Sequence, residues 1–487
     1  MNKYLRKTFD YAAGSFFNKL LLLLFLPIFT SYMIPEEYAV YSNLMIFFTL
    51  MSLIVLLGLQ QSLFSHFYQE QTDGYKFTLM SSVYFVLIAA GIVFSFLIVI
   101  FRNQLALITV RDTQYAVLFI DMAIIIFFNT IFSISTGFLN IMEQSAKFAV
   151  ISTLQNLIIL ILVVIFAINK QFSLQLYFHF FAISTFIAAI VSMISVIKIM
   201  EAYKLPADEK KLFSAPLIRS MLKFGLVMIP GSIAVLVLQA SDRYMLTFLS
   251  AHALYDVGIY AAGYRIGMIM HFLVSLVSLV YIPYAMKIAD QPAAKAINRS
   301  MYNYYILFGT VLGVSVILFG KELFYVLIDQ QYFASNQIVF SGVISSFLYG
   351  IFNILNIHFY AAKKASNIMT AVVVGAVLNI ILNFLFIPKF GIYGAAIASI
   401  LAYLVIMLID FVASHKLFAT NYNPLYFILA LIILLSAAGV NLCLKLSWIL
   451  FFTKIIILII ISFFLYFYLR KNEKLHLIIK KLREIRT

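Results

Sequence analysis

Long apolar segments recur along the whole sequence, and they constrain its fold more than any other feature. Many run for eighteen residues or more, which lets a helix cross the ~30 Å hydrocarbon core of a bilayer. Charged residues make up only 11% of the 487 positions, and hydrophobic residues make up 64%. Because soluble domains carry about a quarter charged residues, the sequence predicts a polytopic membrane protein.

The segments predict an all-α integral membrane protein with about 14 transmembrane helices. They lie at approximately 11–33, 38–62, 76–100, 113–138, 146–167, 173–197, 217–241, 254–286, 299–319, 333–360, 366–388, 391–413, 424–444 and 448–469. Similarity between YAAGSFFNK (11–19) and MIPGSIAVL (228–236) indicates an internal duplication. We therefore expect two pseudo-symmetric six-helix lobes plus two C-terminal helices.

The longest connection is charged and contains a proline, and it divides six segments from eight. We take it as a cytoplasmic linker between two lobes. The expected organisation is an N-terminal lobe at 1–200, the linker at 201–216, a C-terminal lobe at 217–416, helices 13 and 14 at 417–470, and a basic tail at 471–487.

Lysines and arginines predict the orientation. Of the 34, twenty-four fall on the side that holds both termini and eight fall on the opposite side, while two lie inside segments. The positive-inside rule therefore places both termini in the cytoplasm. The same rule explains the net charge of +15, so no nucleic-acid partner is expected.

Lys19 and Arg265 are the two cations inside predicted segments. A cation at such a depth costs at least ~2.5–3.5 kcal/mol, so it should face water or a partner. One interpretation is structural, with the side chains reaching an interface or pairing with a carboxylate. The other is a cationic cavity that binds an anionic headgroup, because the planar guanidinium of arginine suits phosphate.

Three further residues are candidates for ion binding or gating. Asp121 lies about eight residues into the fourth segment, where it is either a counter-ion or a proton or Na⁺ site. Asp242 and Arg243 are neighbours that close the seventh segment, so we expect a helix-end or gate pair.

Signals of an enzyme, a cofactor or a metal are absent from the sequence. Gly320 and Lys321 are followed by Glu322 rather than by Ser or Thr, so there is no Walker A pattern. No cofactor, metal site or catalytic residue is expected. Energy must then come from an ion gradient or from the gradient of the substrate.

The stretch LNIILNFLFIPKFGIYGAAIASILAY (378–403) resembles the polysaccharide exporters of the multidrug/oligosaccharidyl-lipid/polysaccharide (MOP) superfamily, of the O-antigen flippase type. VGIYAAGYRIGMIM (257–270) and the SDRYML end of the seventh segment resemble the same family. This resemblance implies a bacterial inner-membrane flippase for an undecaprenyl-diphosphate-linked oligosaccharide, as in O-antigen and lipopolysaccharide biosynthesis. It also implies alternating access coupled to H⁺ or Na⁺, cations in a central cavity, membrane lipids as partners, and a polysaccharide polymerase and chain-length regulator as further partners.

Other functions remain open on the sequence. A cation-coupled antiporter of small drugs would share the architecture and would require acidic residues deep in the N-terminal lobe. A glycan polymerase or acyltransferase would require a sizeable outside loop, and every predicted outside loop is short. Two cations within the membrane argue against a purely structural scaffold.

Overall fold

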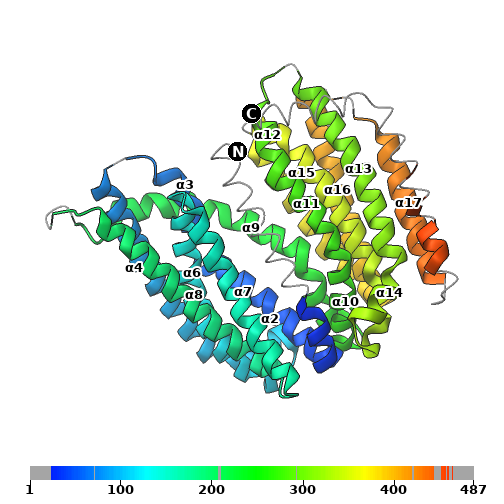
Figure 1. The fold of residues 1–487 in the computed structure, drawn as a ribbon, viewed down its shortest axis with the longest axis horizontal. Helices are drawn as coiled ribbons and strands as arrows, with labels where there is room; N and C mark the ends of the chain where they lie inside the picture. The colour runs from blue at the N-terminus through cyan, green and yellow to red at the C-terminus, as the bar shows by residue number, and fades with distance from the viewer. Residues whose placement is uncertain are drawn as a thin grey trace. The chain divides into compact units, whose positions relative to one another are not determined.

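The chain forms two compact helical units (Figure 1). The computed structural model describes residues 24–70, 72–206, 210–291, 293–362, 364–418, 420, 422–443, 451–456, 458–459 and 463. No strand occurs in these described ranges. The N-unit is Phe9–Ala240, described from residue 24, and the C-unit begins at Ser241. The division falls inside helix α9 (Ala215–Leu249), whose residues are shared between the two units.

The N-unit is built around helix α6. Residues 24–32 are helical and are followed by α2 (Pro35–Val55), α3 (Leu59–His66), α4 (Asp73–Ile100), α5 (Arg102–Val110), η1 (Thr113–Val117), α6 (Leu118–Ile141), α7 (Ser145–Ile168) and α8 (Leu174–Ala202). Helix α6 packs against α4 on one side and α8 on another. It buries sixteen of its side chains, so it forms the core of this unit.

Two glycines let the first part of α9, which belongs to the N-unit, pack very closely against the turn before α3. Gly58, in the turn before α3, has a φ of 67°, a left-handed conformation that glycine adopts without strain. A Cβ atom on Gly225 of α9 would lie 2.4 Å from the carbonyl oxygen of Gly58. Nearby, His66 and Ser220 link α3 to α9 through a 3.1 Å hydrogen bond. The first part of α9 therefore packs backbone to backbone.

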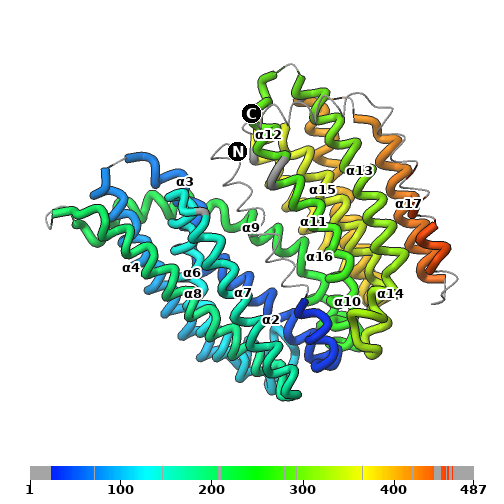
Figure 2. The backbone as a smooth tube through the Cα atoms, viewed as in Figure 1, coloured from blue at the N-terminus to red at the C-terminus, as the bar shows by residue number. Residues whose placement is uncertain are grey.

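The C-unit is centred on α15, which packs along α16 and against α10 and α13. Its elements are α10 (Ala253–Gly267), η2 (Met268–Met270), α11 (His271–Leu276), η3 (Val277–Tyr281), α12 (Ile282–Lys287), α13 (Ala294–Leu318), α14 (Gly320–Leu327), η4 (Gln330–Ile338), α15 (Val339–Ala361), α16 (Ala365–Phe418) and α17 (Pro424–Cys443). Figure 2 shows these helices running side by side within the unit.

Helix α16 is a helical hairpin rather than one continuous helix. Its backbone leaves helical geometry at Gly391, where φ is 53° and ψ is −130°, just after Pro388. Proline removes a backbone donor and glycine tolerates the positive φ, so the chain reverses there. The predicted segments 366–388 and 391–413 are the two arms of this hairpin.

The predicted segment 254–286 is helical but interrupted. It is divided into α10, η2, α11, the π-helical turn η3 and α12, and Pro283 lies at the start of α12. A proline inside a helix leaves a carbonyl without its donor, and a widened π turn accommodates the missing bond. The predicted segment is therefore one helical region with a distorted second half.

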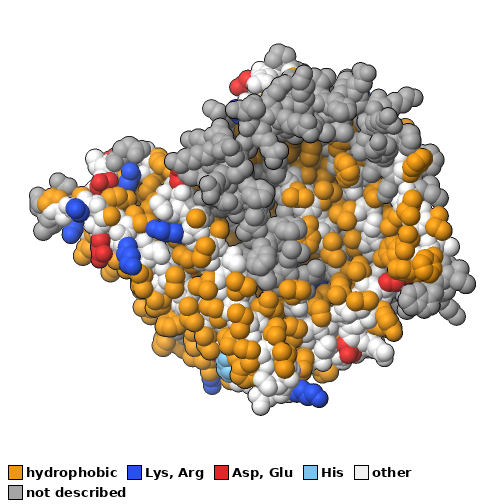
Figure 3. All heavy atoms as spheres, viewed as in Figure 1, with side chains coloured by type: hydrophobic (Ala, Val, Ile, Leu, Met, Phe, Trp, Pro, Cys, Tyr) orange, Lys and Arg blue, Asp and Glu red, His pale blue; other side chains and the backbone are white. Residues whose placement is uncertain are grey.

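The protein is a multi-pass membrane protein. Eleven helices of the described ranges are long and apolar enough to cross a membrane, and one of them, Ser366–Leu417, is the hairpin. Those eleven therefore account for twelve of the fourteen predicted segments, and the fold class is confirmed. In Figure 3, hydrophobic side chains cover the visible sides of the helices, and charged side chains gather near helix ends.

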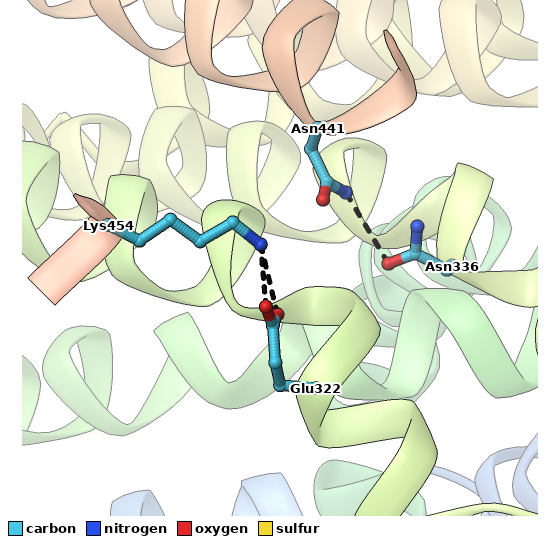
Figure 4. A network of polar contacts seen from close by, with 4 residues as sticks. All are labelled: Glu322, Asn336, Asn441 and Lys454. Carbon is cyan, nitrogen blue, oxygen red and sulfur yellow. Dashed lines mark hydrogen bonds and ion pairs between the residues drawn. The ribbon is translucent and has the colours of Figure 1, made fainter. Parts of the chain in front are cut away.

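Two polar links join α17 and the helical residues 451–456 to one end of the C-unit, which we call the α14 end. Lys454 Nζ lies 2.8 and 3.1 Å from the two carboxylate oxygens of Glu322 in α14 (Figure 4). Asn441 of α17 donates to Asn336 of η4 at 3.4 Å. We call the opposite end, which holds α12 and the end of α15, the α12 end.

Candidate functional site

A buried carboxylate with several polar partners lies inside the C-unit. Asp242 of α9 is 3% exposed. Its Oδ2 accepts hydrogen bonds from Tyr260 of α10 at 2.5 Å and from Ser399 of α16 at 2.6 Å. Its Oδ1 accepts from Asn383 of α16 at 3.4 Å. Helix α10 and both arms of α16 thus supply donors to one carboxylate.

A second layer of hydrogen bonds holds these partners in place. Asn383 donates to Asn379 Oδ1 at 3.0 Å, and Ser241 donates to the same oxygen at 2.6 Å. Asn379 in turn donates to Ser399 at 3.4 Å. We call the resulting set the Asp242 network; it consists of Ser241, Asp242, Tyr260, Asn379, Asn383 and Ser399.

The local sequence explains why these side chains converge. Asn379 and Asn383 are four residues apart, so they share one face of the first arm of α16. Ser399 lies on the second arm, and the reversal at Gly391 brings it back opposite the asparagines. The LN..LN, P, G and AS positions of the 378–403 stretch therefore build this network.

The network presents oxygen atoms suited to a proton or to a small hard cation. Asp242 supplies a carboxylate, and Asn383 Oδ1 is buried with no hydrogen-bond partner among the described residues. Carboxylate, amide and hydroxyl oxygens are the ligands that hard cations prefer. No group of three or more His, Cys, Asp or Glu side chains that could hold a metal ion occurs in the described ranges. A transition-metal centre is therefore not indicated there.

Cationic and aromatic side chains adjoin the Asp242 network. Arg243 follows Asp242 on α9, and its guanidinium lies 5.9 Å from the ring centre of Tyr264 on α10. Tyr264 stacks on Tyr260 with 5.6 Å between ring centres. Arg265 follows Tyr264 and is half-buried, twelve residues after the start of α10, about 18 Å along the helix. The predicted position of Arg265 inside a span therefore fits the length of α10.

One expectation for this region needs correction. The seventh segment does not end at 241: α9 continues to Leu249, so Asp242 and Arg243 lie within the helix and not at its end. Arg243 is thus a further cation inside a helix that is long and apolar enough to span a membrane. Tyr260 and Tyr264 are 1% and 4% exposed, so both belong to the core.

Asp121 is buried in the N-unit beside a histidine. It lies in α6 and is 7% exposed, and His179 Nδ1 of α8 is 2.9 Å from its Oδ1. The histidine side chain is 43% exposed. Arg265 belongs to the C-unit and Lys19 lies outside the described residues, so the described partner of Asp121 is His179. The expected intramembrane carboxylate is present, with a partner that the sequence did not indicate.

Comparison with known families and proteins agrees with this architecture. Residues 4–289 match the model of the family described as polysaccharide biosynthesis protein. The chain is 25% identical over 410 residues to an uncharacterized membrane protein of Methanocaldococcus jannaschii, covering 80% of this chain and 79% of that protein.

Solved structures with similar folds are membrane transporters. The lipid II flippase MurJ in an inward closed conformation aligns with a TM-score of 0.75 and 16% identity, over 94% of this chain and 99% of that one. An inward-facing multidrug resistance transporter of the MATE family and MOP superfamily aligns with a TM-score of 0.60 and 13% identity, over 83% and 96%. At these identities the likeness concerns the fold.

Proposed function

Because this chain belongs to the polysaccharide biosynthesis protein family and is a transporter of the MOP superfamily, we propose that it flips a lipid-linked oligosaccharide. The substrate would be an undecaprenyl-diphosphate-linked repeat unit of a surface polysaccharide, moved across the bacterial inner membrane. The observation that carries this proposal is a half-buried arginine, Arg265, deep in a span beside an aromatic pair.

The diphosphate is the part of this substrate that the chain is best equipped to recognise. Arg265 and Arg243 place two guanidinium groups within the span, on α10 and α9. Guanidinium forks match phosphate oxygens, and low polarity strengthens such contacts. We assign Arg265 and Lys19 to the headgroup, with Arg243 as an added candidate. Alternating access between the N-unit and the C-unit would carry the headgroup across.

Coupling to an ion gradient is part of the proposal, and the Asp242 network is its best-supported site. The carboxylate, on α9, lies among amide and hydroxyl groups of α10 and α16. A bound Na⁺ or proton would change the free energy with which α9, α10 and α16 pack together. A conformational change follows only where the ion binds one conformation more tightly than the other. Asp121 with His179 is a second candidate, because a carboxyl group and an imidazole 2.9 Å apart can share a proton.

The proposal can be tested in proteoliposomes with a fluorescent undecaprenyl-diphosphate oligosaccharide. Arg265→Ala should weaken apparent substrate affinity roughly ten- to a hundred-fold, as expected for a lost charge-assisted contact. Arg299→Ala removes an exposed arginine of the same unit and is the matched control. Equal flipping by both variants, or no flipping by the wild type, contradicts the proposal.

The coupling ion can be assigned in the same vesicles. Asp242→Asn keeps the shape of the side chain but removes its charge, so the response to an imposed Na⁺ or pH gradient should disappear. Asp121→Asn serves as the comparison. If the gradient response is lost in Asp121→Asn and kept in Asp242→Asn, the coupling site lies in the N-unit instead.

A multidrug antiporter is the second candidate function, and Asp121 favours it. Such a transporter needs an acidic residue deep in the N-terminal lobe, and Asp121 is buried there. Proton-driven efflux of cationic dyes from the same vesicles, lost in Asp121→Asn, would favour this function. A wild type that flips the lipid-linked substrate and exports no dye excludes it. A cytoplasmic location of both termini, and a polymerase or chain-length regulator as partner, remain predictions.

A further inference from the structure

A second buried aspartate of the C-unit has surroundings unlike those of Asp242. Asp410 lies on the second arm of α16, eight residues before the helix ends at Phe418, or about 12 Å along the helix. It is 0% exposed. The residue therefore lies toward the α12 end, where we have assigned neither substrate binding nor ion binding.

Helix α15 and aromatic side chains enclose this carboxyl group. Tyr360 of α15 is an electrostatic neighbour of Asp410. One helical repeat away on the same face of α16, Tyr403 contacts Tyr349 of α15 with ring centres 6.0 Å apart. Phe411 follows Asp410 and packs near Tyr422 at 6.2 Å. The ionisable groups described near this interface are these tyrosines and His358 of α15, whose Nε2 lies 2.6 Å from the hydroxyl oxygen of Tyr422.

Neither oxygen of Asp410 receives a hydrogen bond from the described residues. The nearest hydroxyl along the helix face, that of Ser414, donates instead to the carbonyl oxygen of Phe411 at 3.1 Å. Asp242 is equally buried but accepts three hydrogen bonds. Two buried aspartates of one unit are thus held in opposite ways, one surrounded by donors and the other by none among the residues described.

Energetics decide the protonation state. An isolated carboxylate in an apolar interior costs far more than a fold can offset, so a buried acid without donors neutralises itself. A metal ion is a poor alternative, because the described ranges hold no group of three or more acidic, His or Cys side chains around it. A single proton is sufficient to remove the charge.

A polar cavity at the same end offers protons a route toward α15. It has a volume of about 290 Å³, and its walls include Asp290, Lys295, Asn298 and His358. His358 and Ala361 line it, and Tyr360 lies between them in the sequence of α15. Water in this cavity would therefore reach the turn of α15 that carries Tyr360, the electrostatic neighbour of Asp410.

We propose that Asp410 is a proton-binding site of the C-unit, separate from the Asp242 network, and that it holds a proton when α15 and α16 pack as they do here. Loss of this proton would place an uncompensated charge between the two helices and force them apart at the α12 end. This site deepens the proposed ion-coupled transport and rests on it for its role. The occupancy by a proton is independent of that role.

Infrared difference spectroscopy of the purified protein tests the occupancy directly. At neutral pH, the difference spectrum between the wild type and Asp410→Asn should contain the carbonyl stretch of one protonated carboxylic acid, because any proton held at Asp121 or Asp242 contributes equally to both spectra. Glu201→Gln removes an exposed acid that does not line the cavity and should leave this band unchanged. An unchanged band in Asp410→Asn shows that the group is ionised and overturns the proposal.

Transport assays then separate this proposal from the flippase function. If Asp410 exchanges its proton during the cycle, Asp410→Asn should abolish the pH dependence of flipping while remaining folded by circular dichroism. A variant that keeps the wild-type pH profile overturns the role in transport. A wild type that flips no lipid-linked oligosaccharide contradicts the proposed function, yet leaves the infrared result on Asp410 valid.

Discussion

The ion pair between Glu322 and Lys454 should stabilise the C-terminal helices against the rest of the C-unit. Both carboxylate oxygens of Glu322 contact the Lys454 ammonium, at 2.8 and 3.1 Å (Figure 4). The two partners differ in burial: the Lys454 side chain is 4% exposed and that of Glu322 is 18% exposed. Removing one partner leaves the other charge unpaired, and the cost depends on how well the remaining charge reaches water.

This difference predicts an asymmetry between the two single variants. Glu322→Gln leaves the ammonium of Lys454 buried beside Phe319, so it should cost about 3–5 kcal/mol. Lys454→Met leaves a carboxylate in the first turn of α14, partly exposed and near the positive end of the helix dipole, so it should cost only about 1–3 kcal/mol. The double variant removes both charges and should recover most of the larger loss.

Equilibrium unfolding in mixed micelles with increasing SDS, followed by far-UV circular dichroism, measures these differences. Lys287→Met removes an exposed lysine of the same unit and should change the free energy of unfolding by less than about 0.5 kcal/mol. Equal losses in the two single variants, or additive losses in the double variant, would refute the argument from burial.

Two further predictions concern α9 and α14. Gly225→Ala should destabilise the N-unit by about 1–3 kcal/mol, because the added Cβ would lie 2.4 Å from the Gly58 carbonyl oxygen. Gly439→Ala in α17 meets nothing within 4 Å and should stabilise by up to about 1 kcal/mol in the same unfolding assay; equal effects of the two would contradict this reasoning. Burial and the nearby Lys454 ammonium lower the pKa of Lys321, so the unfolded state holds this proton more tightly and wild-type stability should rise as pH increases through the folded pKa. Lys321→Gln should lack this rise when the two unfolding curves are compared across alkaline pH, and an identical rise would exclude Lys321 as its source.

The number and order of the membrane spans follow from the sequence, because the length of an apolar run is a local property. The positions where helices break do not follow as well. The segment 254–286 contains only isolated polar residues and no polar run, yet it divides at the π turn η3 before Pro283. The end of α9 was placed at 241 because Asp242 and Arg243 resemble a loop in hydropathy. Buried polar groups and helix ends both interrupt an apolar run, so a single sequence does not distinguish one from the other.

Partnerships between helices were the least predictable part of the candidate site. Asp121 and His179 are 58 residues apart, and nothing in either segment marks them as a pair. Asn379 and Asn383 are four residues apart, a spacing that puts both on one face of a helix. Its partner Asp242 lies 141 residues from Asn383, so only the packing of α9 on the α16 hairpin reveals the contact. The roles assigned to Lys19, Arg265 and Asp121 stay predictions.

The two buried aspartates of the C-unit constrain how ion coupling can work. Asp242 accepts three hydrogen bonds, so its carboxylate is solvated by the protein where it lies. Asp410 has no such donors among the described residues, so losing its proton requires the helices around it to move. Both lie on or against α16, which packs along α15 from one end of the unit to the other. An ion bound at Asp242 and a proton bound at Asp410 would therefore bias the same helix pair, and each should change the affinity for the other by the same factor.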